Sequence, residues 1–337
     1  MSTLAPPRPA TAAPATSPGL RGPARAVFRQ HRRPFHLLAL LTVLAVAGLV
    51  AVTLWVGHDA DVFSRAGCPT GDTTPTPTCA QTVRDHMDSQ FLLYRAQRCA
   101  ALMLTLLPAV YGAFMAGPAI GRELESGTHR LAWTQSVSPA RWLTAKLAVP
   151  ATAVVAATLV LGTARAWASG RAEEYSDSWY DGLRSATGVL PLAYALFALA
   201  VGTLAGLLLR STLRSMAAAL AAQGIAVYGF DAVRAHLWPV VTATHPTSST
   251  GGFQRDRWVV DTGYLTPTGE RLPAGTCVGD SGAGDACRDA LGITGRFVDY
   301  HPESHRWPLQ LVESGVLLAV AALAVYTAYR LLRRPHA

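Results

Sequence analysis

Lysine is almost absent from this sequence. Lys146 is the only one, and it stands between Ala145 and Leu147 rather than in the Gly-Lys-Ser/Thr order that holds nucleotide phosphates in a P-loop. The sequence therefore excludes a conventional P-loop ATPase. It also lacks the HExxH, CxxC and GxSxG motifs of metal, redox and nucleophile chemistry. We expect no catalytic residue, no metal ligand and no cofactor, and we expect that the chain is not an enzyme.

Charged residues are also scarce, at 15% of 337 residues against about a quarter in soluble domains. Half of the residues are apolar, and they gather in long runs. The net charge of +8 would suit nucleic acid, but the placement of that charge favours a membrane protein, so no nucleic-acid partner is expected. The near-exclusive use of arginine, with many Ala, Gly and Pro residues, is typical of a GC-rich genome and favours a bacterial source.

Six apolar runs approach or reach the length of about 20 residues that a helix needs to cross a membrane. We predict an all-α integral membrane protein whose membrane domain covers residues 35–334. The spans are expected at residues 35–56, 100–120, 147–164, 189–209, 213–231 and 309–332. The first run exceeds the apolar part of a signal peptide and no clean cleavage site follows it, so we expect an uncleaved anchor.

The excess of basic residues lies on one side of the predicted membrane. Residues 1–34 hold six arginines and no acid. With residues 121–146, the turn after the fourth span and the C-terminus, this side has 15 basic and 2 acidic residues. The three alternate loops, which include residues 58–98 and 232–306, have 14 basic and 18 acidic residues. Because basic loops stay inside, we expect both termini in the cytoplasm and a multi-pass protein of the cell membrane.

Four of the five cysteines fall in the expected outside loops as two closely spaced pairs, Cys68 with Cys79 and Cys277 with Cys287. Short Gly/Pro/Thr-rich loops outside the reducing cytosol favour disulfides within each pair. Four unrelated thiols are the alternative. Cys99, at the start of the second span, is expected to be a small packing residue.

The outside loops carry some structure of their own. The first begins as a Pro/Thr-rich loop at His58, and apolar residues at spacings of four over residues 83–91 then predict a helix that runs into the second span. Residues 258–260 read as a strand that enters a turn at residues 266–270. We expect a small cap joined by disulfides, too small to be an independent enzyme.

Polar residues within the predicted spans are few. Gln223 lies in the middle of the fifth span, and Glu313 lies about one turn inside the sixth. Such residues mark ion or substrate paths in some membrane proteins. The simpler interpretation, which we favour, has Gln223 hydrogen-bonded to another helix and Glu313 close to the aqueous interface.

Residues 121–146 are more elaborate than a plain connector between helices, which needs only a few residues. A short charged helix is expected to end at Gly127. A later helix is expected to begin with Ser138 as its N-cap and Pro139 in its first position. Such a folded cytoplasmic elbow favours a functional role, and an interfacial helix that merely lies on the headgroups is the alternative.

This segment resembles the first cytoplasmic loop of ABC-2-type transporter permeases, particularly the actinobacterial ones. The family pattern Glu-x-Glu-x-Gly-Thr-x-x-Leu continues with a Thr-Gln-x-Val-Ser stretch and then Arg-x-Leu-x-x-Lys-Leu. The matching residues are Glu123, Glu125, Gly127, Thr128, Leu131, Thr134, Gln135, Val137, Ser138, Arg141, Leu143, Lys146 and Leu147. Six spans with both ends inside also fit the family, whereas the long last outside loop departs from it and leaves the substrate open.

The resemblance implies a division of labour. A separate ABC ATPase subunit would dock on this loop, and a second permease subunit, as a homodimer or heterodimer, would complete the path across the lipid bilayer. Residues 123–138 would contain the coupling helix, and the charges of Glu123, Glu125 and Arg130 would help select the partner. Because the family is mostly exporters, a small or lipid-like molecule would move outward. The implied ATPase-coupling residues are Glu123, Glu125, Gly127, Thr128, Arg130, Leu131 and Gln135.

Two other classes of function compete with an export permease. A stand-alone carrier would need buried ionisable residues or an inverted repeat, and the sequence offers neither in a recognisable form. A membrane sensor or assembly factor would use the disulfide-joined outside cap to bind a partner. An adjacent ATPase gene would favour the permease over both.

Overall fold

The computed structural model describes residues 21–68, 77–128, 138–171, 186–246, 257–277 and 281–333. Six helices in these ranges are long and apolar enough to cross a membrane, which confirms the predicted all-α membrane fold. Each predicted apolar run falls on one of them. They are α2 (Arg32–Ala66), the continuous run of α3 (Pro77–Tyr111), η1 (Gly112–Ala116) and α4 (Gly117–Glu125), then α6 (Pro139–Ser169), α7 (Leu190–Leu209), α8 (Thr212–Val233) and α10 (Arg306–Arg333).

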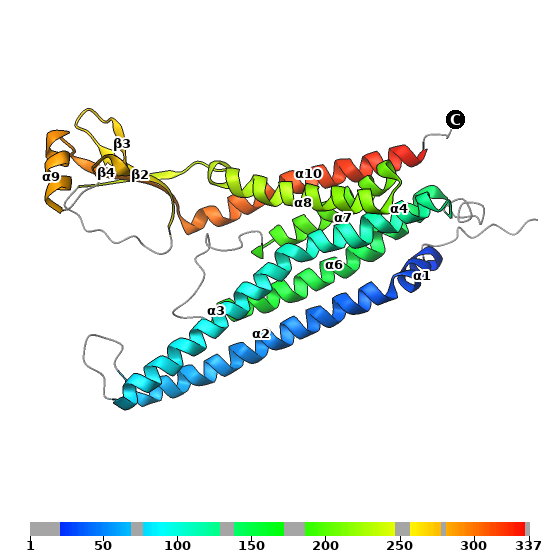
Figure 1. The fold of residues 1–337 in the computed structure, drawn as a ribbon, viewed down its shortest axis with the longest axis horizontal. Coiled ribbons are helices and arrows are strands. Elements are labelled where there is room, and N and C mark those ends of the chain that lie inside the picture. The colour runs from blue at the N-terminus through cyan, green and yellow to red at the C-terminus, as the bar shows by residue number, and fades with distance from the viewer. Residues whose placement is uncertain are drawn as a thin grey trace, which may run out of the picture.

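The bundle has two distinct ends (Figure 1). The short helix α1 (Arg21–Gln30), the last turn of α4, the start of α6 and the end of α10 lie at one end, which we name the elbow end. A four-stranded sheet lies beyond the opposite end, which we name the cap end. Four spans separate the end of α4 from the C-terminal end of α10, and this even number of crossings brings both to the elbow end.

Helices α2 and α3 form a hairpin that continues past the rest of the bundle at the cap end (Figure 1). The helix expected over residues 83–91 is present and runs without a break into the second span. The Pro/Thr loop expected from His58 is wrong, because α2 stays helical to Ala66. The reason is contact with α3, where the Asp59 carboxylate accepts a hydrogen bond from Ser89 Oγ at 2.6 Å and lies 3.2 Å from His86 Nδ1.

The disulfide between Cys68 and Cys79 joins the tips of α2 and α3 and confirms the first predicted pairing. Cys99 is a free thiol, and the expectation that it packs inside the protein is wrong, since its side chain is exposed on the surface of α3. A free cysteine behaves as a small hydrophobic residue, so it suits a surface that faces lipid as well as it suits a core.

Helix α7 lies at the centre of the bundle and packs against α3, α4, α6, α8 and α10. Its contact with the second span is made by glycines. A Cβ atom added at Gly202 would lie 2.6 Å from the carbonyl oxygen of Gly112, and one added at Gly206 would lie 2.7 Å from that of Gly117. Small residues let helix backbones touch in lipid, where dispersion contacts drive association. We name this contact between the second span and α7 the glycine seam.

The second span changes its helical geometry where it meets this seam. Pro108 lies inside α3 and removes one backbone hydrogen bond. The next turn, η1, is a π-helix of five residues, and α4 resumes with Pro118 in its first turn. A π-helical turn is uncommon and often occurs at functional sites. It lets the span reach α7 on one side and still direct α4 toward the elbow end.

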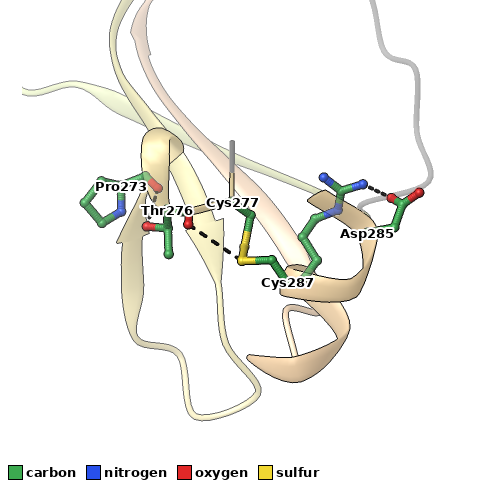
Figure 2. Close-up of a disulfide and its surroundings, with 6 residues drawn as sticks. Pro273, Thr276, Cys277, Asp285 and Cys287 are labelled. Atoms are coloured by element: carbon green, nitrogen blue, oxygen red, sulfur yellow. Dashed lines mark hydrogen bonds and ion pairs between the residues drawn. A yellow bond between two sulfur atoms is a disulfide. The ribbon is translucent and has the colours of Figure 1, made fainter. Parts of the chain in front are cut away.

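The cap consists of a mixed-length antiparallel sheet in the order β1-β4-β2-β3. The predicted strand and turn are confirmed, because β2 passes into a turn in which Thr266 N donates a hydrogen bond to Glu270 O at 3.1 Å. The disulfide of Cys277 with Cys287 confirms the second pairing and ties the segment after β3 to α9 (Figure 2). The elements are β1 (Val241–Pro246), β2 (Trp258–Leu265), β3 (Arg271–Pro273), α9 (Ser281–Ala290) and β4 (Gly295–His301).

Candidate functional site

The elbow end carries the segment that the sequence singles out. Helix α4 ends at Glu125, and Gly127 follows with φ of +73°, a conformation that suits glycine and ends the helix as expected. Helix α6 begins as expected, with Ser138 Oγ accepting a hydrogen bond from Arg141 N and with Pro139 in the first position. Of the predicted coupling residues, Arg130, Leu131 and Gln135 lie outside the described residues.

Glu123 joins three helices at the elbow end. Its carboxylate accepts hydrogen bonds from Lys146 Nζ at 2.5 Å, Trp142 Nε1 at 3.0 Å and Gln30 Nε2 at 3.1 Å. Lys146 is only 4% exposed, and its ammonium also donates to Ala119 O at 3.2 Å. A buried charge needs such a set of partners, because desolvation would otherwise cost several kcal/mol. The only lysine of the chain is therefore the internal counter-ion of Glu123, which ties α4 to α1 and α6.

Glu125 makes a second connection from the same helix. Its carboxylate accepts hydrogen bonds from Thr212 N at 3.1 Å and Thr212 Oγ1 at 2.9 Å, in the first turn of α8. The residue before α8, Ser211, makes no side-chain capping bond of its own. A carboxylate at a helix N-terminus satisfies free N–H groups and interacts favourably with the helix dipole. Glu125 thus acts as the cap of a helix that lies 87 residues further along the chain.

A hollow of about 900 Å³ opens between α1, α4 and α6 beside these contacts. Arg122 and Thr128 are exposed at its wall, and Lys146 and Glu123 form part of its floor. His31 lies close by; burial lowers the pKa of its imidazole, and the Lys146 ammonium lowers this pKa further, against a smaller opposing effect of Glu123. The hollow therefore presents polar and cationic groups at the end of the bundle.

A second polar cluster lies at the cap end, between α7, α8 and α10. Glu313 is fully buried, and its carboxylate accepts two hydrogen bonds from Arg234 at 2.8 Å each and one from Tyr194 OH at 2.7 Å. The expectation that Glu313 stays at the aqueous interface is therefore wrong. Arg234, expected in the outside loop of residues 232–306, is the first residue after α8 and supplies the counter-charge.

Gln223 lies in the middle of α8 and is 2% exposed. The expectation that its amide bonds another helix is wrong, because neither amide atom has a hydrogen-bond partner in the part of the chain that the structure describes. The buried acid and the buried amide therefore differ: Glu313 is fully paired, and Gln223 is not.

The base of the cap touches this second cluster through histidines. His301 Nε2 lies 3.0 Å from Ala235 O, and His301 Nδ1 lies 3.0 Å from His305 Nδ1. A carbonyl oxygen can only accept, so Nε2 carries the proton and Nδ1 of His301 accepts from His305. Burial lowers the pKa of His301, and His305 lowers it further, whereas the bond to Ala235 raises it. Within the described residues, no group of three His, Cys, Asp or Glu side chains has the geometry of a metal site.

These features define a multi-pass membrane protein with a clamped elbow at one end and a folded cap at the other. Residues 38–234 match the family model described as ABC-2 membrane transporter related. The match covers more than half of the chain, so the chain belongs to this family. It includes α4 and two of the helices that anchor it, α6 and α8, whereas α1 lies before the matched residues and the cap lies after them. No curated protein and no solved structure gives a significant match.

Proposed function

We propose that this chain is the transmembrane permease subunit of an ABC transporter that exports a small or lipid-like molecule. A separate ATPase subunit hydrolyses the ATP and docks on residues 121–138 at the elbow end, which faces the cytoplasm. The observation that carries this proposal is the pair of anchors on α4. Glu123 fixes α4 to α1 and α6, and Glu125 fixes it to α8.

The two anchors explain how a push on the elbow would reach the spans. Force applied to α4 passes through the Lys146 ion pair into α6 and through the Thr212 cap into α8. It also passes directly into the second span, since α4 continues that helix without a break. The hollow between α1, α4 and α6 supports docking because its exposed Arg122 and Thr128 are available to a partner segment.

The proposal assigns different roles to the coupling residues. The carboxylates of Glu123 and Glu125 are bound within the chain, so we assign them to positioning of the elbow rather than to direct partner selection. Gly127 and Thr128, with the following residues Arg130, Leu131 and Gln135, form the surface for the ATPase. A second permease subunit, identical or different, completes the path.

Copurification tests this function. The tagged chain is expressed in its native host, purified in mild detergent, and its partners are identified by mass spectrometry. We expect a near-stoichiometric P-loop ATPase that is lost when residues 123–138 are replaced by a Gly/Ser linker. A matched linker replacement of the cap turn at residues 266–270 should leave the ATPase bound.

The second candidate is a membrane sensor or assembly factor. The observation in its favour is the cap, whose sheet and disulfide make a folded surface beyond the bundle. Recovery of the chain without any ATPase, under conditions that preserve other transporter complexes, would refute the permease and favour this candidate.

A further inference from the structure

An open groove of about 570 Å³ runs along the outer surface of the bundle between α6, α7 and α10. It is separate from the hollow at the elbow. Its walls are almost entirely apolar and come from all three helices. The main side chains are Leu147 and Ala151 of α6, Leu196 and Ala200 of α7, and Leu318 and Val325 of α10.

The polar groups of the groove all lie at its elbow end. Thr144 Oγ1 and Tyr329 OH are hydrogen-bonded at 2.7 Å and close the groove there. Tyr326, also in the wall, accepts a hydrogen bond from Arg330 Nε at 2.7 Å. The terminal nitrogens of Arg330 have no hydrogen-bond partner among the described residues. The groove is thus apolar along its length, with hydroxyls and one cation at one mouth.

The length of the groove matches one leaflet of a bilayer. Leu318 and Tyr329, which line its two ends on α10, are separated by about 16 Å at 1.5 Å per helical residue. Half of the hydrocarbon core is about 15 Å thick. Tyrosine and arginine favour the headgroup level of a membrane, where the ring meets the hydrocarbon and the guanidinium meets phosphate.

We propose that this groove binds one acyl chain of an anionic phospholipid from the leaflet on the elbow side. The chain lies along Leu147, Leu196 and Leu318, and the phosphate binds Arg330 beside the Tyr326 hydroxyl. The lipid is a resident of the bilayer rather than transported cargo. This binding depends on the membrane-spanning fold and not on whether an ATPase docks at the elbow.

Photo-crosslinking in vesicles tests the site. The full chain is reconstituted in mixed phosphatidylglycerol and phosphatidylcholine vesicles that contain a trace of one lipid with a diazirine in its acyl chain, and labelled peptides are identified by mass spectrometry. We expect labelling by the phosphatidylglycerol probe at residues 147–151 and 318–325. Ala322→Phe fills the groove from α10 and should abolish this labelling. Ala319→Phe, on the same helix and exposed outside the groove, should leave it unchanged.

The headgroup is tested by charge removal. Arg330→Gln should reduce the preference for phosphatidylglycerol over phosphatidylcholine about fivefold, the effect of one cation near an anionic surface. Arg333→Gln, exposed one turn further on, is the matched control. Equal labelling of the Ala322→Phe and Ala319→Phe variants would overturn the site, and so would an unchanged lipid preference in Arg330→Gln. Efficient crosslinking of Ala322→Cys between two copies of the chain would overturn it in favour of a protein-filled groove.

Discussion

At the scale of single residues, a few charged side chains of this chain lie buried between helices. Lys146 and Glu313 are both almost inaccessible, and each is paired with an opposite charge from another helix. Removing one member of such a pair leaves the other charge buried without compensation, which costs more than the pair itself contributes. Each ion pair therefore favours one particular contact between helices: Lys146 with Glu123 joins α6 to α4, and Arg234 with Glu313 joins the end of α8 to α10.

Loss of the Glu123 carboxylate tests this argument. We expect Glu123→Gln to destabilise the protein by about 3–5 kcal/mol, because Lys146 stays buried without its counter-ion. The double variant Glu123→Gln with Lys146→Met should recover most of that loss. Unfolding in mixed detergent micelles measures both effects in a double-mutant cycle. Glu125→Gln is the comparison variant; its carboxylate is exposed, so its loss should destabilise the protein far less than Glu123→Gln. Strictly additive effects of Glu123→Gln and Lys146→Met on the free energy of unfolding would contradict the buried pair.

His301 gives the cap a dependence on pH. Its folded-state pKa lies below the ordinary value, so the unfolded chain binds the proton more readily. The stabilising effect is complete above about pH 6.5 and is lost as the pH falls through that value toward the lowered pKa of the folded state. We expect the cap to unfold more easily at pH 5.5 than at pH 7.5, as measured by the fluorescence of Trp258, which contacts His301.

The matched variants for this effect lie on the same sheet. His301→Asn should remove most of the difference between the two pH values, whereas His245→Asn, on the exposed strand β1, should keep it. An identical pH dependence in both variants would show that another group is responsible.

At the scale of the helices, the contact between the second span and α7 depends on missing side chains. Glycines at positions 112, 202 and 206 bring the two backbones together, and Gly117 makes room for Ser215 of α8. Because the π-helical turn and Pro108 lie at the same place, this contact also determines the direction in which α4 leaves the bundle. The elbow is therefore positioned from two sides, by the ion pairs at its end and by the glycine seam below it.

Substitution of Gly202 by alanine tests the seam. Its new methyl group would meet the carbonyl oxygen of Gly112 at 2.6 Å, so the helices must separate. We expect a loss of about 1–3 kcal/mol, as for other overpacked interiors, in micelle unfolding measurements. Gly224→Ala on α8 has nothing within 4 Å and should change stability little. A Gly202→Ala variant as stable as Gly224→Ala would refute a close backbone contact.

Local features of these helices could be predicted from the sequence, and distant contacts could not. The start of α6 follows from Ser138 and Pro139, the end of α4 from Gly127, and both disulfides from short spacing in the loops. The pairing of Glu313 with Arg234 spans 79 residues, and no local pattern identifies it. The Pro/Thr-rich composition of the first outside loop was also misleading near Asp59, where α2 stays helical because the carboxylate is hydrogen-bonded to α3.

At the scale of the whole molecule, the two ends differ in chemistry. The described elbow end has a buried lysine, exposed arginines and a hollow partly lined by charged side chains, whereas the cap end has disulfides and a sheet. This asymmetry agrees with the distribution of basic residues along the sequence, which predicts that the elbow end faces the cytoplasm.

Accessibility of single cysteines tests this orientation. In a Cys99→Ser background, Thr268→Cys at the cap and Ser126→Cys at the elbow are treated with a membrane-impermeant maleimide. We expect labelling of Thr268→Cys in intact cells and of Ser126→Cys only after permeabilisation, because both side chains are exposed at opposite ends of the bundle. The four disulfide-bonded cysteines should react only after reduction. The reverse pattern would invert the topology.

The α2–α3 hairpin is a long, stiff element that extends from the elbow end to beyond the cap end of the bundle. Helix α2 has 35 residues and is about 52 Å long, against a hydrocarbon core of about 30 Å. Its base lies beside α1, which Gln30 links to Glu123, and its tip is fastened to α3 by the Cys68–Cys79 bond. A tilt of about 10° at the elbow end would displace this tip by about 9 Å. A small rotation on one side of the membrane would thus become a large movement on the other.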